Sequence, residues 1–181
     1  MRPVVVTAIL LLVVLMSMSD SAAGGPAEMC KTEYPFTPCR KNVGEGWAQY
    51  GKNLCVKAFF NNPHLGHSEA EMACRKFPKG HLVSIDNVEE NNQVQCAMYR
   101  ATTGKAHYWI GVYTKLVGRT KKWAWTDDNF VRYTKWARGQ PDNFLFREDC
   151  VEMNYWDWGL WNDAYCKEKK PYVCEVIIKD D

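Results

Sequence analysis

The chain contains 181 residues with a formal net charge of +2 at pH 7, and 24% of its residues are charged and 13% aromatic. This composition excludes an intrinsically disordered chain and a polybasic nucleic-acid-binding protein. It leaves both an enzyme and a binding module open.

The first predicted element is a secretory signal peptide over residues 1–23. Arg2 precedes an apolar run from Val4 to Met18, and small residues then lead to a cleavage point before Gly24. About fifteen apolar residues are short for a bilayer span of about twenty, so a retained anchor is the less favoured alternative. Because no other segment is long enough to span a membrane, we expect no membrane insertion and a secreted, extracellular protein.

Removing 23 of 181 residues leaves 158, and these include all eight cysteines. The secretory route favours paired disulfides over metal thiolates. Residues 24–38 contain the isolated Cys30 and are predicted to be an N-terminal extension, whereas residues 39–178 form one folded domain with its own core. Cys39 and Cys55 flank a glycine-punctuated stretch that is typical of a hairpin.

Two helices are predicted next. Ser68 and Glu71 form a capping box that opens the first helix, and Pro78 ends it. Asn87 opens the second helix, and Cys96 is expected on its outer face. The buried stripe of the second helix consists of Val94, Ala97, Met98 and Ala101.

Short apolar and aromatic runs then predict strands at residues 108–112, 122–125 and 172–178. The stretch between the last two, residues 127–170, is expected to be irregular and contains Cys150 and Cys166 in addition to many polar residues. An irregular segment of that length inside a compact domain is normally functional or crosslinked.

This irregular stretch contains five side chains that offer only oxygen ligands: Gln140, Asp142, Glu148, Asn162 and Asp163. Calcium prefers such a set, whereas zinc and copper favour histidine or thiolate. A cis peptide bond before Pro141 would turn the side chains on either side of it to the same side. The alternative for each short motif is that these residues are ordinary turn formers.

The order of several motifs resembles the C-type lectin-like domain family, over about Cys39 to Val176. The motifs are Trp109-Ile110-Gly111, Trp123-Ala124-Trp125, Gln140-Pro141-Asp142, Glu148-Asp149-Cys150, Trp161-Asn162-Asp163, Cys166 and Cys174. The resemblance implies an α+β fold with two helices, two small antiparallel sheets and a long calcium-binding loop region. The disulfides it implies are Cys39–Cys55, Cys74–Cys174 and Cys150–Cys166.

Cys30 and Cys96 remain unassigned by the resemblance. They pair either within the chain, which we favour, or between two chains of a disulfide-linked homodimer. Such a dimer would supply the multivalency that weak single sites need.

The resemblance further implies that the five oxygen-bearing side chains hold one Ca²⁺, which itself binds two vicinal hydroxyls of a sugar. Gln140, Asp142, Glu148 and Asn162 would also hydrogen-bond those hydroxyls. The order amide first and acid second, in Gln140-Pro141-Asp142, is the family's galactose type. The tryptophan that often follows this motif is missing, and Phe144, Trp156 or Trp158 would take its place or be ordinary core or rim aromatics.

Residues 113–118 contain no acid for an auxiliary calcium, so Asn143 and Asp149 are expected to serve the loop structure. His64 and His67, like the basic cluster of Lys167, Lys169 and Lys170, are expected to be solvated. The core is expected to contain Trp109, Trp123, Trp125 and Trp161.

No nucleophile or acid–base pair indicates an enzyme. We therefore expect a secreted, calcium-dependent lectin for glycans with terminal galactose or related sugars, acting in recognition or innate defence. The alternative function for the same fold is binding to a non-sugar surface, namely ice, calcium carbonate mineral or a protein partner.

Overall fold

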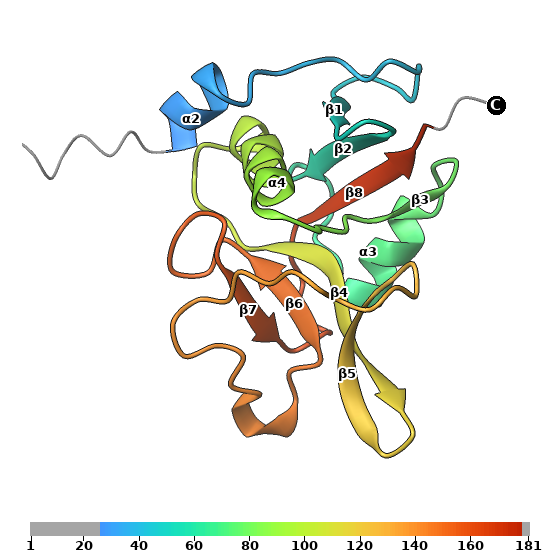
Figure 1. Ribbon diagram of the computed structural model, residues 1–181, viewed down its shortest axis with the longest axis vertical. Coiled ribbons are helices and arrows are strands. Elements are labelled where there is room, and N and C mark those ends of the chain that lie inside the picture. Colours follow the sequence, from blue (N-terminus) through green and yellow to red (C-terminus); the bar gives the residue numbers. More distant parts are fainter. Residues whose placement is uncertain (1–25, 179–181) are drawn as a thin grey trace, which may run out of the picture.

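The computed structural model describes residues 26–178, so the predicted signal peptide and its cleavage point lie outside the described residues. The fold is α+β, as the sequence predicts, with three helices around a mixed sheet (Figure 1). The helices are α2 (Pro26–Thr32), α3 (His67–Cys74) and α4 (Val88–Ala101). None of the helices within residues 26–178 has the length and apolar character needed to cross a membrane.

The strands are β1 (Ala48–Tyr50), β2 (Leu54–Phe59), β3 (Gly80–Leu82), β4 (Tyr108–Val117), β5 (Thr120–Trp125), β6 (Cys150–Met153), β7 (Trp161–Ala164) and β8 (Tyr172–Ile177). Their order is β1-β2-β8-β4-β6-β7, with β3 beside β8 and β5 beside β4. Two antiparallel groups of strands meet where Trp109 of β4 pairs in parallel with Tyr172 of β8. The two expected sheets are therefore joined into one hydrogen-bonded network.

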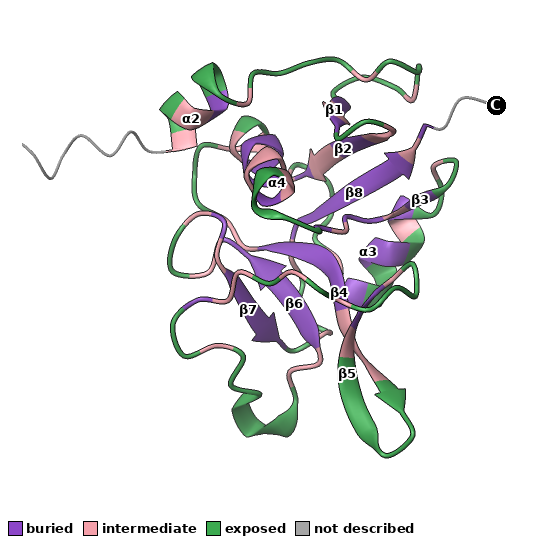
Figure 2. Cartoon of the chain, viewed as in Figure 1, coloured by how far each residue is buried: buried purple, intermediate pink, exposed green. Residues whose placement is uncertain are grey.

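The expectation that residues 127–170 are irregular is wrong for β6 and β7. Each strand has only four residues, and all of them are buried (Figure 2). A strand that is buried on both faces lacks the apolar–polar alternation by which a half-exposed strand is recognised in a sequence.

The predicted capping box of α3 is also wrong, by two residues. Gly66 is the N-cap, and the carboxylate of Glu69 accepts a hydrogen bond from its amide at 2.9 Å. Ser68 therefore lies inside the helix, which ends at Cys74 rather than at Pro78.

Glu71, the residue expected to close that capping box, has a structural role inside the protein. It is buried, and its carboxylate accepts hydrogen bonds from the amide of Leu82 at 2.8 Å and the guanidinium of Arg75 at 2.6 Å. His81 lies 2.9 Å from the same carboxylate. Glu71 thus joins α3 to β3 through the amide of Leu82 and the ring of His81.

Helix α4 begins as predicted, with the side-chain oxygen of Asn87 accepting from a backbone amide of the first turn. Val94 and Met98 of the expected stripe are fully buried. Cys96 on the other face is also fully buried rather than outward-facing, because α2 lies against α4 and Cys30 bonds to Cys96.

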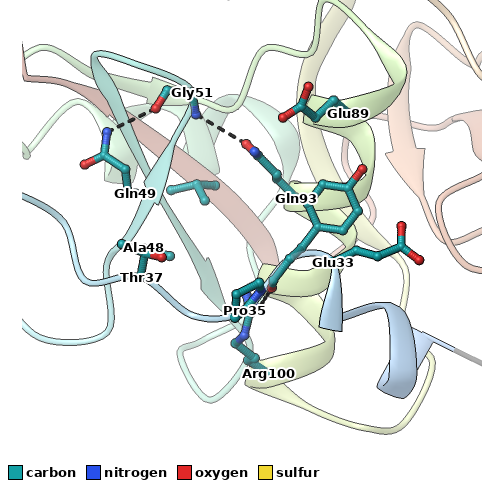
Figure 3. A pocket seen from close by; sticks show the side chains of 11 residues that line it. Glu33, Pro35, Thr37, Ala48, Gln49, Gly51, Glu89, Gln93 and Arg100 are labelled. Atoms are coloured by element: carbon teal, nitrogen blue, oxygen red, sulfur yellow. Dashed lines mark hydrogen bonds between the residues drawn. The ribbon is translucent and has the colours of Figure 1, made fainter. Parts of the chain in front are cut away.

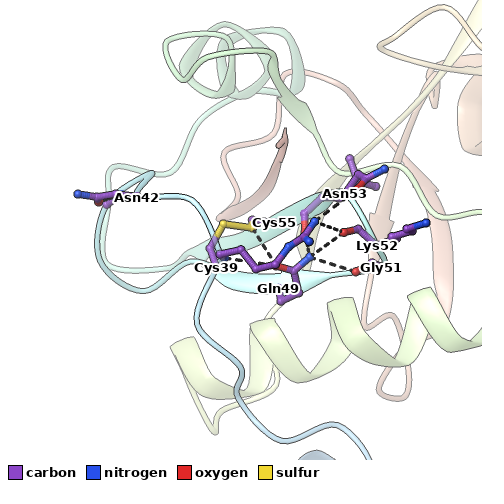
Figure 4. The surroundings of a disulfide bond; sticks show 10 residues. Cys39, Asn42, Gln49, Gly51, Lys52, Asn53 and Cys55 are labelled. Atoms are coloured by element: carbon purple, nitrogen blue, oxygen red, sulfur yellow. Dashed lines mark hydrogen bonds between the residues drawn. A yellow bond between two sulfur atoms is a disulfide. The ribbon is translucent and has the colours of Figure 1, made fainter. Parts of the chain in front are cut away.

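All eight cysteines form disulfides within the chain. The pairs are Cys30–Cys96, Cys39–Cys55, Cys74–Cys174 and Cys150–Cys166. The three pairings implied by the family resemblance are confirmed, as is the favoured intrachain pairing of the remaining two cysteines. Figure 4 shows the Cys39–Cys55 bond beside Gln49, whose amide donates to backbone carbonyls of the β1–β2 turn.

Trp161 is the centre of the aromatic core that supports β7. Its ring lies edge-to-face against Trp125, Tyr133 and Trp136, with centroid separations of 5.9, 5.8 and 5.9 Å. Its indole N–H donates to the side chain of Asn91 on α4 at 2.8 Å. The expected burial of Trp161 is confirmed, as it is for Trp109 and Trp125, while Trp123 is half-buried.

The Cys30–Cys96 bond gives a prediction about stability and assembly. It spans 66 residues, and closing such a loop stabilises a chain by up to about 4 kcal/mol in the chain-entropy model. Replacing both cysteines with alanine should lower the melting temperature by about 5 °C or more in calorimetry. On non-reducing electrophoresis the unmodified protein should migrate as a monomer, and a band at twice the mass would contradict the intrachain bond.

Candidate metal and ligand site

Three acidic side chains converge at one end of the long loop that connects β5 to β6. One carboxylate oxygen each of Asp142, Glu148 and Asp163 lies within 4.8 Å of the others. Asp142 is exposed, Glu148 half-buried and Asp163 buried in β7. Within residues 26–178 this is the one group of three or more acidic, histidine or cysteine side chains that is close enough to hold a metal ion.

The loop backbone is folded around these carboxylates. Asp163 accepts from the amides of Asp142 and Asn143 at 3.1 and 2.8 Å. The amide of Phe144 donates to Asp142 at 3.1 Å and to Glu148 at 2.7 Å. Asn143 in turn accepts from the amide of Glu148 at 3.2 Å, so it serves the loop structure as the sequence predicts.

Gln140 lies beside this group, and Asn162 has a different hydrogen-bonding partner. The Gln140–Pro141 peptide bond is cis, and the side-chain amide of Gln140 donates to Asp142 at 3.3 Å. The NH₂ group of Asn162 donates to the buried carboxylate of Glu152 at 2.9 Å. Of the five predicted ligands, the structure therefore gathers three and places a fourth next to them.

Glu152 is a supporting residue that the sequence analysis missed. Its carboxylate lies 2.8 Å from the ammonium of Lys170 and 3.1 Å from His107. Burial opposes ionisation of Glu152, but His107 and Lys170 outweigh it and lower its pKa. Its position between the apolar residues of β6 could have identified it in the sequence, because a carboxylate that is buried in a strand requires a charged or hydrogen-bonding partner.

The contacts of Glu152 also correct the expectation for Lys170. The Lys170 side chain is only 12% exposed and pairs with both Glu152 and Glu168, so it is not part of a solvated face. Since the carboxylate of Glu152 is neutralised in this way, it can hold the amide of Asn162 in one orientation. An amide whose NH₂ group is engaged retains its oxygen for another partner.

The three converging acids repel one another. Burial, followed by the charges of Asp163 and Asp142, raises the pKa of Glu148 to about 7. Burial and the charge of Asp142 likewise raise the pKa of Asp163, although amide hydrogen bonds partly offset the shift. Hard oxygen donors carrying three mutually repelling charges suit a divalent cation such as Ca²⁺.

Asp149, the acid next to Glu148, has its own partners. Its carboxylate accepts from the hydroxyl of Thr114 at 2.6 Å and pairs with Lys121 on β5. It therefore connects the loop to the β4–β5 hairpin, in agreement with the structural role expected for it. A shallow hollow of about 180 Å³ lies between this hairpin and the carboxylates.

The candidate aromatic residues differ in their surroundings. Phe144 is exposed and adjoins the carboxylates through its amide hydrogen bonds. Trp158 is half-buried against the core and lies edge-to-face with Tyr99 of α4, which favours the alternative of a rim aromatic. Trp156 is exposed and stacks on Tyr155.

The expectation that His67 lies in a solvated loop with His64 is wrong. His67 is buried at the start of α3, and its Nε2 lies 2.9 Å from the carbonyl oxygen of Ile110. Burial lowers the pKa of His67 to about 4, so the ring is neutral at physiological pH and takes part in the packing of α3 on β4.

A separate hollow of about 230 Å³ lies beside the segment that follows α2. It is bounded by the segment from Glu33 to Thr37, the β1–β2 turn and α4 (Figure 3). The amide of Gly51 donates to Gln93 across one side of it at 3.3 Å. It is distinct from the hollow beside the three carboxylates.

Comparison with known proteins finds a matching family model, similar sequences and similar structures. A family model described as the lectin C-type domain matches residues 65–176. The C-type lectin BpLec of Bothrops pauloensis is 33% identical over 136 residues, covering 74% of this chain and 97% of the relative.

Two solved structures extend the comparison. The carbohydrate-recognition domain of a mouse scavenger receptor C-type lectin aligns with a TM-score of 0.61 at 28% identity, over 75% of this chain and 98% of that one. The type II antifreeze protein of herring aligns with a TM-score of 0.60 at 27% identity, over 75% and 98% of the two chains.

The raised pKa of Glu148 predicts how stability depends on pH. Without a metal ion, folding disfavours ionisation of this carboxyl, so its contribution lowers stability as the pH rises from about 5 to about 8. Glu148→Gln should therefore raise the melting temperature in chelator at about pH 8 and leave it unchanged at about pH 5.

Scanning calorimetry at the two pH values checks this prediction, and calcium supplies the control. In saturating calcium at the higher pH, the same substitution should lower the melting temperature because it removes a charged ligand. A lower melting temperature in chelator as well would show that the three carboxylates do not repel.

Proposed function

Because the chain belongs to the C-type lectin domain family, we propose that it is a secreted, calcium-dependent lectin without catalytic activity. The observation that carries this proposal is the convergence of Asp142, Glu148 and Asp163 within 4.8 Å. Gln140 and Asn162 complete the proposed ligand set. The proposal includes the division into signal peptide, extension and lectin domain at residues 1–23, 24–38 and 39–178.

A bound Ca²⁺ would supply coordination positions for two neighbouring sugar hydroxyls. The ligand side chains contribute the hydrogen bonds: a carboxylate accepts from a hydroxyl, and an amide NH₂ group donates to one. Sugars whose hydroxyls are differently placed would leave these groups unpaired, which discriminates strongly between epimers.

The amide-then-acid order of Gln140 and Asp142 supports a preference for terminal galactose or a related sugar. The adjacent Phe144 ring is exposed and could lie against the apolar face of the bound sugar, whereas the position of Trp158 against α4 makes it the weaker candidate. The related mouse structure is a carbohydrate-recognition domain, in line with this assignment.

The loop contacts support a site whose three carboxylates are already close together before an ion binds. Asp163 lies in β7, and its carboxylate accepts hydrogen bonds from two backbone amides of the long loop, those of Asp142 and Asn143. Pre-formed ligands reduce the entropic cost of binding. Because all cysteines pair within the chain, multivalency would have to come from a non-covalent homodimer or a repeated array.

Asp142→Asn tests the proposed calcium site directly. The substitution removes one of three charges while keeping the side-chain shape, so retention on immobilised galactose in calcium should fall at least about tenfold, together with calcium affinity in calorimetric titration.

The matched control is Asp149→Asn, which removes the neighbouring acid that pairs with Lys121. This variant should retain full galactose binding. Loss of binding in Asp149→Asn alone, with Asp142→Asn unaffected, would place the ion elsewhere and contradict the proposed ligand set.

Specificity is tested by reversing the order of amide and acid. Gln140→Glu combined with Asp142→Asn restores the three carboxylates that Asp142→Asn alone lacks. The resulting Glu-Pro-Asn order is that of the family's mannose-type members, so we expect calcium binding to return and the preference in a competition assay to move from galactose towards mannose. If the double variant binds calcium and still prefers galactose, the order of these two side chains does not set specificity.

The alternative function is binding to a non-sugar surface such as ice, mineral or protein. The similarity to herring antifreeze protein supports ice binding as the case to test. Thermal hysteresis measured in calcium, with galactose as competitor, separates the two functions, because a lectin without ice affinity gives none.

A further inference from the structure

Three consecutive large apolar residues project from the loop beside the carboxylates. The side chains of Phe144, Leu145 and Phe146 are exposed to 65%, 64% and 89%. We refer to these three residues, which form the short helical turn η1 (Phe144–Phe146), as the apolar knob. Leu145 and Phe146 have φ angles of 53° and 58°, in the left-handed region that bulky residues rarely adopt.

The knob is held in place by backbone hydrogen bonds. The amide of Phe146 donates to the carbonyl of Asn143 at 2.8 Å, and that of Arg147 donates to the carbonyl of Phe144 at 3.3 Å. Exposure of apolar surface and left-handed backbone both cost free energy, and within residues 26–178 no other aromatic ring packs against the ring of Phe144 or Phe146. Such strain commonly marks a functional surface.

Three cations lie on the knob's own loop and on the neighbouring hairpin. Arg147 follows it directly, and Arg119 and Lys122 lie on the neighbouring β4–β5 hairpin. None of these three cations has a carboxylate of residues 26–178 within 4.0 Å, whereas Lys115 and Lys121 of the same hairpin are paired.

The knob and the hairpin tip project from the same end of the molecule, away from α2 and the C-terminal strand β8 (Figure 1). Leu116, which is 68% exposed, adds an apolar side chain to the hairpin. The shallow hollow between the hairpin and the loop confirms that the two segments are neighbours. This end therefore presents apolar side chains among cations that have no carboxylate partner within residues 26–178, although Lys122 lies over the ring of Phe130 at 5.9 Å.

We propose that this end of the protein docks on the surface of an anionic lipid bilayer, with the apolar knob entering the headgroup region. Aromatic and aliphatic side chains flanked by cations are suited to this boundary, and anionic headgroups attract unpaired lysine and arginine. A small convex knob falls short of the roughly 800 Å² per partner of a stable protein interface. A bilayer needs no such complementary shape.

Docking at this end leaves the expectation of no membrane insertion as it stands, because that expectation concerned segments long enough to span a membrane. The attachment is peripheral and requires no spanning helix. It also orients the three carboxylates towards the bilayer, so that the lectin would read glycans carried close to the lipid surface. The recognition of glycans near the lipid surface rests on the proposed function, whereas docking itself does not.

Calcium should strengthen the docking. Asp142, Glu148 and Asp163 carry negative charge beside the knob when no metal is bound, and Ca²⁺ would add two positive charges to this end. This dependence also rests on the proposed function. Docking in chelator is the part of the proposal that stands without it.

The test uses sedimentation with vesicles of phosphatidylcholine alone or with phosphatidylserine added. The protein should bind the anionic vesicles in chelator, and more tightly in calcium. The double substitution Leu145→Ser with Phe146→Ser should weaken this binding by at least about tenfold, because two apolar side chains no longer leave water. Met72→Ser, at a residue of α3 that is 59% exposed, is the matched control and should bind as the unmodified protein does.

A second pair of variants tests the charges. Arg119→Gln with Lys122→Gln should weaken vesicle binding and reduce its dependence on salt, whereas Lys76→Gln, an exposed lysine beyond α3, should change neither. Retention on galactose should be unchanged for the Leu145 and Phe146 double variant, which verifies that it is folded.

Equal vesicle binding by the double variant and the unmodified protein would overturn the proposal, as would binding to neutral vesicles with the same affinity as to anionic ones. Absence of vesicle binding with galactose retention intact would overturn the membrane inference alone. Vesicle binding without galactose retention would support docking and refute the proposed sugar specificity.

Discussion

The burial of Trp161 is the constraint on which the proposed site depends. Its ring is enclosed by three other aromatic rings, and its N–H is satisfied by Asn91 of α4. Its backbone amide donates to Lys135 and its carbonyl accepts from Ala137, both at 2.8 Å. The side chain of Trp161 thereby fixes β7 to the core, and its backbone amide and carbonyl fix the long loop to β7.

The site follows from that anchoring. Asp163 lies two residues after Trp161, and its carboxylate gathers the amides of the loop that bears Asp142. Glu152 of the neighbouring strand β6 forms a buried ion pair with Lys170, which precedes β8, and its carboxylate accepts a hydrogen bond from Asn162. The domain thus combines a rigid, charge-compensated support with a group of carboxylates whose charges are not compensated. Such a group is costly to the protein alone and favours binding of a divalent cation, as the raised pKa of Glu148 indicates.

The sequence predicted those features whose partners are close in the chain or whose motif order is distinctive. Asn87 capped α4 as expected, and the cysteine pairing followed the family resemblance. Glu71, His67 and Lys170 were misjudged because their partners, Leu82, Ile110 and Glu152, lie in other elements. The four-residue strands β6 and β7 were missed because full burial removes their periodicity. The three apolar residues of the knob are consecutive in the sequence, but their exposure could not be predicted from it because exposure depends on how the loop folds.

The central claim is that the three converging carboxylates hold the calcium ion to which a sugar binds. A crystal structure grown with calcium and galactose tests it most directly, through the anomalous scattering of the ion. The account predicts one strong peak among Asp142, Glu148 and Asp163, with two sugar hydroxyls in contact with the ion. A crystal with no peak at that position in saturating calcium, or with galactose bound elsewhere on the protein, would contradict it.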